Sequence, residues 1–198
     1  MKKVILSVAA LFAFGFANAQ ETTEEGFANG DVFITGAIGF GSQKQDDAKI
    51  SAFEVAPSIG FFVTPNIALG ARLGYVSLKD ETSPIEEKSN EFSVGVFGRY
   101  YVTPASKFSI FGELGVDYRT RKTEIDLPGA EDVKYNGFGV QVAPGVSYFI
   151  AKNFALEATW GILGYSSDKL DEDNAEAVNS FNFGLDLRDI NLGLIYKF

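Results

Sequence analysis

The chain of 198 residues contains no cysteine and no histidine, and it has one methionine and one tryptophan. Without cysteine, neither disulfides nor thiolate metal sites can stabilise the fold. Without histidine, the Ser-His triads and histidine-assisted dyads of many hydrolases cannot be built. We therefore expect no catalytic residues, no metal site and no cofactor.

Long apolar runs are also scarce, and the clearest one stands at the start of the sequence. Two lysines precede an apolar stretch from Val4 to Phe16, and Ala17-Asn18-Ala19 follows as an A-x-A cleavage site. This order is typical of a secretory signal peptide, and the stretch is too short to span a bilayer as a helix. We expect residues 1–19 to be cleaved and residues 20–30 to form a short acidic tail without fixed structure.

Positively charged residues are also few. The 17 Lys and Arg against 26 Asp and Glu give a formal net charge of −9, and removing the two lysines of the signal peptide makes it −11. Such a surface repels nucleic acid. The mean hydropathy of +0.05, with 21 glycines and 14% aromatic residues, does not suit a helical membrane protein. It suits strands that are apolar on one side only.

What the chain does contain is strict alternation, most clearly at its end. From position 190 to position 198, every second residue is apolar: Ile190, Leu192, Leu194, Tyr196 and Phe198. A period of two predicts a strand with one apolar face. Because chain ends fray unless they are held, we expect this strand to be docked against the rest of the fold.

The same alternation returns in three longer units, each a strand, a short turn and a returning strand. The units run from Phe53 to Gly74, from Phe92 to Gly115 and from Phe138 to Gly161, and their starts lie 39 and 46 residues apart. With a first strand at Val32 to Gly41 and the last strand, they make eight strands. Four longer polar segments, expected to be loops, lie between them: 42–49, 79–89, 120–134 and 166–180.

Each predicted strand has one bulky apolar register and one small or polar register. A lumen about eight strands wide has room mainly for small residues, whereas a water-facing surface would carry more Lys, Glu and Thr. We therefore expect the apolar register to face lipid. Aromatic residues at both ends of the apolar band predict interfacial girdles. They are Tyr100, Tyr101, Tyr148, Phe149, Tyr196 and Phe198 near the turns, and Phe40, Phe53, Tyr75, Phe92, Tyr118 and Phe138 near the loops.

With its signal peptide, hairpins, aromatic girdles and Phe198, the chain resembles the small outer-membrane β-barrel family typified by the OmpA transmembrane domain and OmpX. For residues 31–198 the resemblance implies an all-β fold, an eight-stranded antiparallel up-and-down transmembrane β-barrel with short periplasmic turns and longer extracellular loops. It implies the outer membrane as location and lipid with lipopolysaccharide as surroundings. It also implies that the barrel-assembly machinery reads the apolar residues from Ile190 to Phe198. We expect a monomer.

One strand departs from the simple pattern. Phe181, Phe183, Leu185 and Leu187 hold the odd register, whereas the residues from Ile190 onward hold the even one. A β-bulge near Arg188 and Asp189 would explain this slip. The alternative is that the segment from Phe181 to Leu187 belongs partly to a folded-back loop.

Charged residues on the small register predict the content of the lumen: Glu54, Arg72, Arg99, Glu113 and Glu157, with Asp117, Asp186 and Arg188 nearer the loops. Paired carboxylates can catalyse glycoside hydrolysis. Arg99 and Glu113, however, lie about equally far from the turn that joins their strands, so their charges can neutralise each other where an unpaired charge would be costly. We interpret the first five residues as a structural ion-pair network.

The predicted loops offer two weaker signals. Acidic residues in the second and fourth loops could bind Ca²⁺ or Mg²⁺, but their spacing matches no EF-hand, so solvated loops are the simpler interpretation. Basic residues of the third loop could contact lipopolysaccharide phosphates: Arg119, Arg121, Lys122 and Lys134.

These patterns favour a non-catalytic outer-membrane barrel with a structural or surface-interaction role and a lumen filled by side chains. The alternative is a narrow porin-like channel for small solutes.

Overall fold

The computed structural model describes residues 25–45, 48–83, 85–161, 163–172, 175–184 and 190–198. The expected signal peptide lies outside these ranges. Within them, no helix has the length and hydropathy to cross a membrane. Ten strands are present: β1 (Val32–Gln45), β2 (Ala48–Phe62), β3 (Ile67–Asp80), β4 (Glu87–Tyr101), β5 (Phe108–Ile125), β6 (Val133–Ala151), β7 (Phe154–Trp160), β8 (Leu163–Leu170), β9 (Ala177–Phe183) and β10 (Ile190–Lys197).

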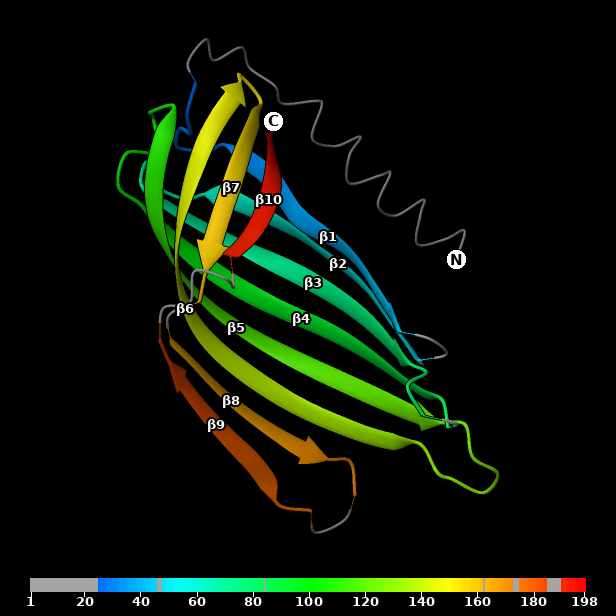
Figure 1. Ribbon diagram of the computed structural model, residues 1–198. Coiled ribbons are helices and arrows are strands. Elements are labelled where there is room, and N and C mark those ends of the chain that lie inside the picture. The colour runs from blue at the N-terminus through cyan, green and yellow to red at the C-terminus, as the bar shows by residue number, and fades with distance from the viewer. Residues whose placement is uncertain (1–24, 46–47, 84, 162, 173–174, 185–189) are drawn as a thin grey trace.

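The strands form one antiparallel ring (Figure 1). Each strand from β1 to β6 pairs with the next one. Along its length β6 then pairs first with β8 and later with β7, and β10 joins β7 to β1. Because β7 with β8, and β9 with β10, are each two halves of one barrel strand, the ring has eight strands. The predicted all-β, eight-stranded antiparallel barrel is confirmed.

The seventh barrel strand is interrupted, which the sequence analysis did not predict. Val146 of β6 lies opposite Ala158, but Val142 lies opposite Leu163, so the outward register changes from even to odd numbers between β7 and β8. Pro144 of β6 stands where the partner changes. Proline cannot donate a hydrogen bond to the ladder, so it suits a break in pairing.

The register slip predicted for the eighth barrel strand is present between β9 and β10. The part of β9 that ends at Phe183 pairs with β8 and is strand rather than folded-back loop. The predicted bulge at Arg188 and Asp189 lies outside the described residues. After the slip, even-numbered side chains from Ile190 onward face outward, whereas Ile195 is buried.

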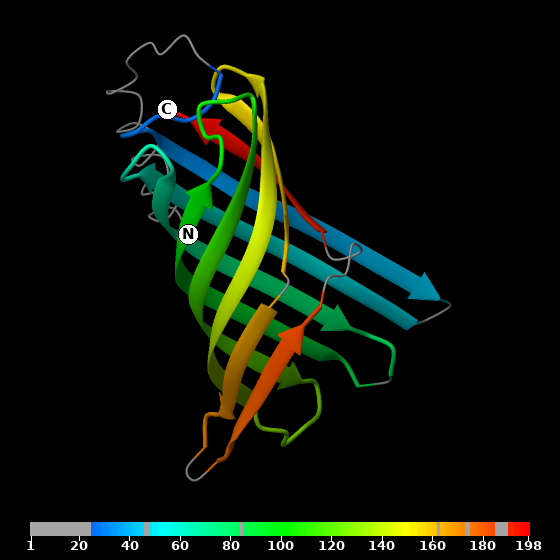
Figure 2. The ribbon, with the colours of Figure 1, turned by 90° about the vertical axis from the view of Figure 1, so that its left-hand side faces the viewer.

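The seam between β1 and β10 is short. Their register covers four residues of β1, from Phe33 to Gly36. Within the described ranges, β9 pairs only with β8, so the outer part of β1 has β2 as its sole neighbour. Figure 2 shows β8 and β9 diverging from β1 at this side of the barrel.

The apolar register faces outward, as predicted. Leucines, valines and aromatic residues of this register are exposed on the barrel wall, including Val96, Leu114 and Tyr118. The girdle prediction is wrong for Tyr101 and Phe149, which are 0% and 1% exposed and point into the lumen. Each follows another girdle residue directly, and successive strand side chains point to opposite faces.

Most of the residues predicted as long loops belong to strands. β1 and β2 extend to Gln45 and Ala48, and β5 and β6 extend to Ile125 and Val133. Polar residues form these extensions because strands beyond the apolar band still pair through their backbones while their side chains meet water.

The start of the described chain closes the turn-side end of the barrel. The backbone N–H of Phe27 donates to Pro104 O at 2.7 Å, and its ring contacts Phe33, Phe62, Tyr101 and Phe149 at centroid distances of 4.8 to 5.5 Å. Phe27 is 2% exposed. The expectation of an acidic tail without fixed structure is therefore wrong for residues 25–30. The buried cluster around Phe27 is what gives this segment a fixed position.

Replacing Phe27 by alanine should lower the free energy of unfolding by about 3 kcal/mol or more, because a buried ring is lost and leaves a cavity. Urea unfolding of protein folded in lipid vesicles, followed by the fluorescence of Trp160, measures this change. Leu127→Ala, a truncation of an exposed residue between β5 and β6, serves as the control and should change little. Equal effects of the two variants would contradict a structural role for Phe27.

Candidate functional site

The lumen holds a chain of ion pairs centred on Arg99 of β4. Arg99 Nε donates to Glu113 Oε2 of β5 at 2.7 Å, and the two residues lie directly opposite each other. Arg99 also donates across the lumen to both carboxylate oxygens of Glu157 in β7, at 2.6 and 3.1 Å. One guanidinium therefore connects the β4–β5 hairpin with β7, which only the curvature of the barrel brings near it.

Arg72 of β3 extends this chain toward the loops. Its Nη1 donates to Glu113 Oε1 at 2.7 Å, and its Nε and Nη2 donate to the two carboxylate oxygens of Asp117, each at 2.6 Å. Asp117 completes the network; the sequence indicated it as an inward charge nearer the loops but did not include it in the ion-pair set. Its position four residues after Glu113 on the same face of β5 is the signal that could have placed it there. Asp186 and Arg188 lie outside the described residues.

Four of the five predicted lumen residues thus lie in one network, and Glu54 does not. Glu54 of β2 lies opposite Gly39 on the lumen face, but among the described residues it makes no ion pair, and its side chain is exposed. In the ladder between β2 and β3, Arg72 lies opposite Ser58. Glu54 is four residues from Ser58 along β2, on the loop side. This difference in height separates it from the buried carboxylates.

The part of the network nearer the turns is the most deeply buried. Arg99, Glu113 and Glu157 are each 5 to 8% exposed. The guanidinium carbon of Arg99 also lies 4.6 Å from the centroid of the Phe111 ring and 4.9 Å from that of Phe97. Bidentate hydrogen bonds and aromatic faces together compensate a guanidinium that has left water.

Glycines make room for these inward side chains. The ring of Phe111 lies over Gly145, that of Phe33 over Gly60, and the guanidinium of Arg72 over Gly115. A Cβ at any of these glycines would collide with the side chain that covers it. The glycine-rich register therefore serves as a surface for large inward groups from neighbouring strands.

Below the ion pairs, buried aromatic side chains and Lys197 fill the lumen. Lys197 Nζ donates to Gly26 O at 2.5 Å, lies 3.5 Å from Asp31 Oδ2 and stands over the Phe149 ring. These contacts hold the Phe27 segment from the side of β10. The cluster of aromatic side chains and the ion-pair network form two successive layers across the barrel.

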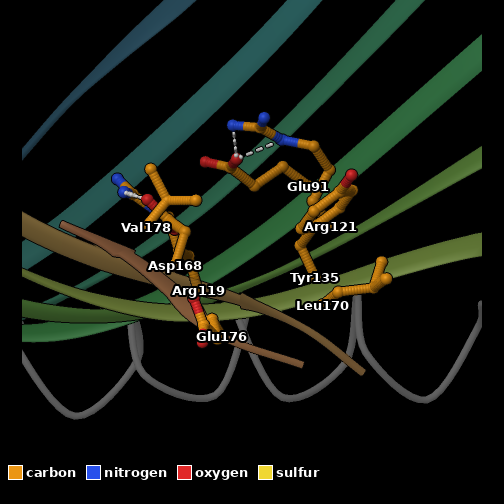
Figure 3. Close-up of a pocket in the computed structure, with 8 residues that line it drawn as sticks. All are labelled: Glu91, Arg119, Arg121, Tyr135, Asp168, Leu170, Glu176 and Val178. Carbon is orange, nitrogen blue, oxygen red and sulfur yellow. Dashed lines mark hydrogen bonds and ion pairs between the residues drawn. The ribbon is translucent and has the colours of Figure 1, made fainter. Parts of the chain in front are cut away.

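Above the ion pairs, the loop side of the lumen contains a cavity of about 250 Å³. Two ion pairs line it, Arg119 with Asp168 and Arg121 with Glu91 (Figure 3). Tyr135, Leu170, Glu176 and Val178 complete the lining. Arg119 and Arg121 thus face the lumen, although the sequence analysis placed them with outward lipopolysaccharide contacts.

Three acidic residues of the second and fourth loops form ion pairs with basic neighbours: Glu81, Glu86 and Asp168. Glu81 and Glu86 both contact Lys79 Nζ, at 2.8 and 2.9 Å. Asp168 bonds to Arg119. No group of three or more potential metal ligands occurs in the described ranges.

The residues predicted as an assembly signal form the outward face of β10. Tyr196 contacts Phe154 and Phe198 at ring-centroid distances of 5.0 and 4.9 Å. The backbone N–H of Phe198 donates to Val32 O at 3.0 Å, across the seam with β1. Tyr196 and Phe198 therefore lie at the point where the ring closes.

Comparison with known proteins agrees with this architecture. The family model of the outer membrane protein beta-barrel domain matches residues 6–198. Among solved structures, the chain is similar to the outer membrane protein OprG from Pseudomonas aeruginosa, with a TM-score of 0.54 and 15% identity over 88% of this chain and 99% of that one. At this identity the likeness shows the fold alone.

Two further structures are similar at lower scores. Neisserial surface protein A has a TM-score of 0.47 and 18% identity over 84% of this chain and 97% of its own. A major outer membrane protein from Thermus thermophilus has a TM-score of 0.49 and 12% identity over 85% of this chain and 98% of its own. No curated protein matches the chain at a significant level. Because the family model covers nearly the whole sequence and the strands close into a barrel, the chain belongs to the outer membrane protein beta-barrel domain family and lies in the outer membrane.

Proposed function

We propose that the protein is a non-catalytic barrel with a closed lumen, whose role is structural or depends on its extracellular surface. The observation that carries the proposal is the pair of layers across the lumen, the Arg99 network and the aromatic cluster around Phe27. Ions would have to pass buried, mutually neutralised charges and then packed rings. The narrow solute channel is the competing function, and it is favoured by the cavity between Arg119 and Arg121.

The absence of histidine from the sequence supports the non-catalytic part of the proposal. Each lumen carboxylate of the buried network also accepts hydrogen bonds from arginine. A carboxylate whose oxygens are occupied by arginine in this way is poorly placed to contact a substrate. We further propose that the protein acts as a monomer in contact with lipopolysaccharide.

Planar-bilayer recording of the purified, refolded protein separates the closed barrel from the channel. We expect no steady single-channel current in the native protein. Arg99→Ala combined with Phe27→Ala, which removes one group from each layer, is the positive control and should raise the frequency of open events. Steady ion-selective currents through the native protein would refute the closed lumen.

A double-mutant cycle tests the ion pairs independently of conduction. Arg99→Met and Glu157→Gln keep side-chain volume while removing charge. Arg99→Met alone leaves Glu157 without its arginine, and Glu157→Gln alone leaves Glu113 as the carboxylate partner of Arg99. We expect a coupling of about 2 kcal/mol in the free energy of unfolding, since paired buried charges are strongly non-additive. The more exposed pair Arg121 and Glu91 is the matched control and should couple by less than about 1 kcal/mol. Similar coupling in both pairs would speak against a dry lumen.

We also propose that the outward residues of β10, with Phe198, guide assembly of the barrel. Tyr196 and Phe198 contact each other beside the seam, so a charge there would disturb both ring closure and the membrane interface. Phe198→Asp should reduce the amount of folded protein in outer-membrane fractions several-fold, whereas Phe198→Tyr should retain it. Immunoblots of unboiled samples measure folded protein. Unchanged levels in the Phe198→Asp variant would contradict the proposal.

A further inference from the structure

The outward face of the barrel carries a repeated pattern beyond the loop-side aromatic girdle. On seven barrel strands an aromatic residue is followed, two positions further out, by Ser, Thr or Asn and, two positions beyond that, by Lys. The seven sets are Phe40, Ser42 and Lys44; Phe53, Ser51 and Lys49; Tyr75, Ser77 and Lys79; Phe92, Asn90 and Lys88; Tyr118, Thr120 and Lys122; Phe138, Asn136 and Lys134; and Tyr165, Ser167 and Lys169. We name the seven lysines the lysine collar.

The eighth strand keeps the first two steps of this pattern. β9 has Phe181 and Asn179, but Ala177 stands where the other strands have lysine. Ladder registers carry the pattern from strand to strand, with Lys122 opposite Lys134 and Lys169 opposite Asn136. The repetition therefore follows the circumference of the barrel rather than one hairpin.

Charge is sorted by face in these strands. Residues two and four positions apart share a face, so the collar lysines project outward with the exposed aromatic residues. The register places all four arginines of the described strands on the lumen face: Arg72, Arg99, Arg119 and Arg121. Among the carboxylates of those strands, Glu124 alone shares the outward face. An acidic chain therefore presents a row of lysines at one level of its outer wall.

The height of the collar corresponds to the lipid headgroups. Four residues of strand rise about 13 Å, or about 10 Å along the membrane normal when strands tilt by about 40°. The polar layer of a bilayer is roughly 5 to 8 Å thick on each side. Lysine can bend its ammonium group back along its stem, so the charges reach the phosphate level while the Ser, Thr and Asn layer lies beneath.

Three hairpins place two collar lysines directly opposite each other: Lys44 with Lys49, Lys79 with Lys88, and Lys122 with Lys134. Like charges in directly opposed positions destabilise a sheet. Lys122 forms ion pairs with Glu124 and Asp132, at 2.7 and 2.8 Å, and Lys79 forms them with Glu81 and Glu86. Lys44, Lys49, Lys88, Lys134 and Lys169 make no ion pair within the described part of the chain. A phosphate between two opposed ammonium groups would relieve their repulsion.

We propose that the lysine collar binds the phosphate groups of the glycolipid in the outer leaflet, with the opposed pair Lys44 and Lys49 holding one phosphate. This inference deepens the proposed contact with lipopolysaccharide and names its site. The ligand is a membrane-anchored phosphate, since the girdle and the collar together match an acyl region below and an anionic group above. The aromatic residues contact the acyl chains near the interface, and the Ser, Thr and Asn layer contacts the sugar.

The test measures binding of lipid A in its phosphorylated and dephosphorylated forms to the mature protein in neutral detergent. Lys44→Gln with Lys49→Gln removes the one opposed pair whose two lysines form no ion pair with any residue that the structure describes. Lys107→Gln with Lys152→Gln removes the same charge at the turns on the opposite end and is the matched control. Different migration of unboiled and boiled samples on a detergent gel verifies that each variant is folded.

We expect the native protein to prefer the phosphorylated lipid, and the Lys44 and Lys49 double variant to bind it about tenfold more weakly, because each lysine near an anionic surface contributes substantially. Binding of the dephosphorylated lipid, and binding by the control variant, should change less than about twofold. Equal native affinity for both lipids overturns the proposal. So does unchanged affinity in the collar variant, or displacement of the lipid by an equal concentration of inorganic phosphate.

Conductance separates this inference from the closed-lumen proposal. A native protein that conducts ions but keeps its phosphate preference would refute the closed lumen and leave the collar intact. A barrel that carries no current and shows no preference for the phosphorylated lipid would support the closed lumen and refute the collar.

Discussion

Backbone hydrogen bonding in hydrocarbon is the constraint on which this structure depends. Lipid offers no partner to a free amide or carbonyl, so a chain that crosses the membrane without helices must pair its strands around a ring. Once the ring is imposed, every side chain faces either lipid or lumen, and a single period of two determines both surfaces. The short seam between β1 and β10 is the place where this requirement is met with the fewest residue pairs.

The lumen-facing residues of the strands have to fit into a narrow interior. Eight strands enclose too little space for two large side chains at each level, so inward rings and guanidinium groups lie over glycines of the next strand, as Phe111 does over Gly145. Arg99 then reaches Glu157 across the barrel, and Phe27 enters from the turn side. The interior is therefore a small packed core made of charges above and aromatic rings below.

The two kinds of basic residue divide between the faces for a physical reason. A planar guanidinium can satisfy two carboxylates at once and stack on aromatic rings, which suits a narrow interior. Lysine has a flexible apolar stem and a strongly hydrated ammonium group, so it can cross an apolar surface and end in the headgroup layer. Arg72 and Arg99 inside, and Lys79 and Lys122 outside, follow this division.

The sequence alone determined the number of barrel strands, their lipid-facing register outside the break in the seventh strand, and the proximity of Arg99 to Glu113, because these depend on spacing within one hairpin. It placed the register slip before Ile190 for the same reason. Contacts that depend on curvature were decided only by tertiary structure. Arg72 meets Asp117, and Arg99 meets Glu157, because the closed ring brings β3, β4, β5 and β7 around one lumen. Glu54 shares the predicted face but lies too far toward the loops to join them. Phe27 carries no periodic signal, since a single ring in an acidic segment acquires a position only when a closed barrel presents four aromatic partners at its mouth.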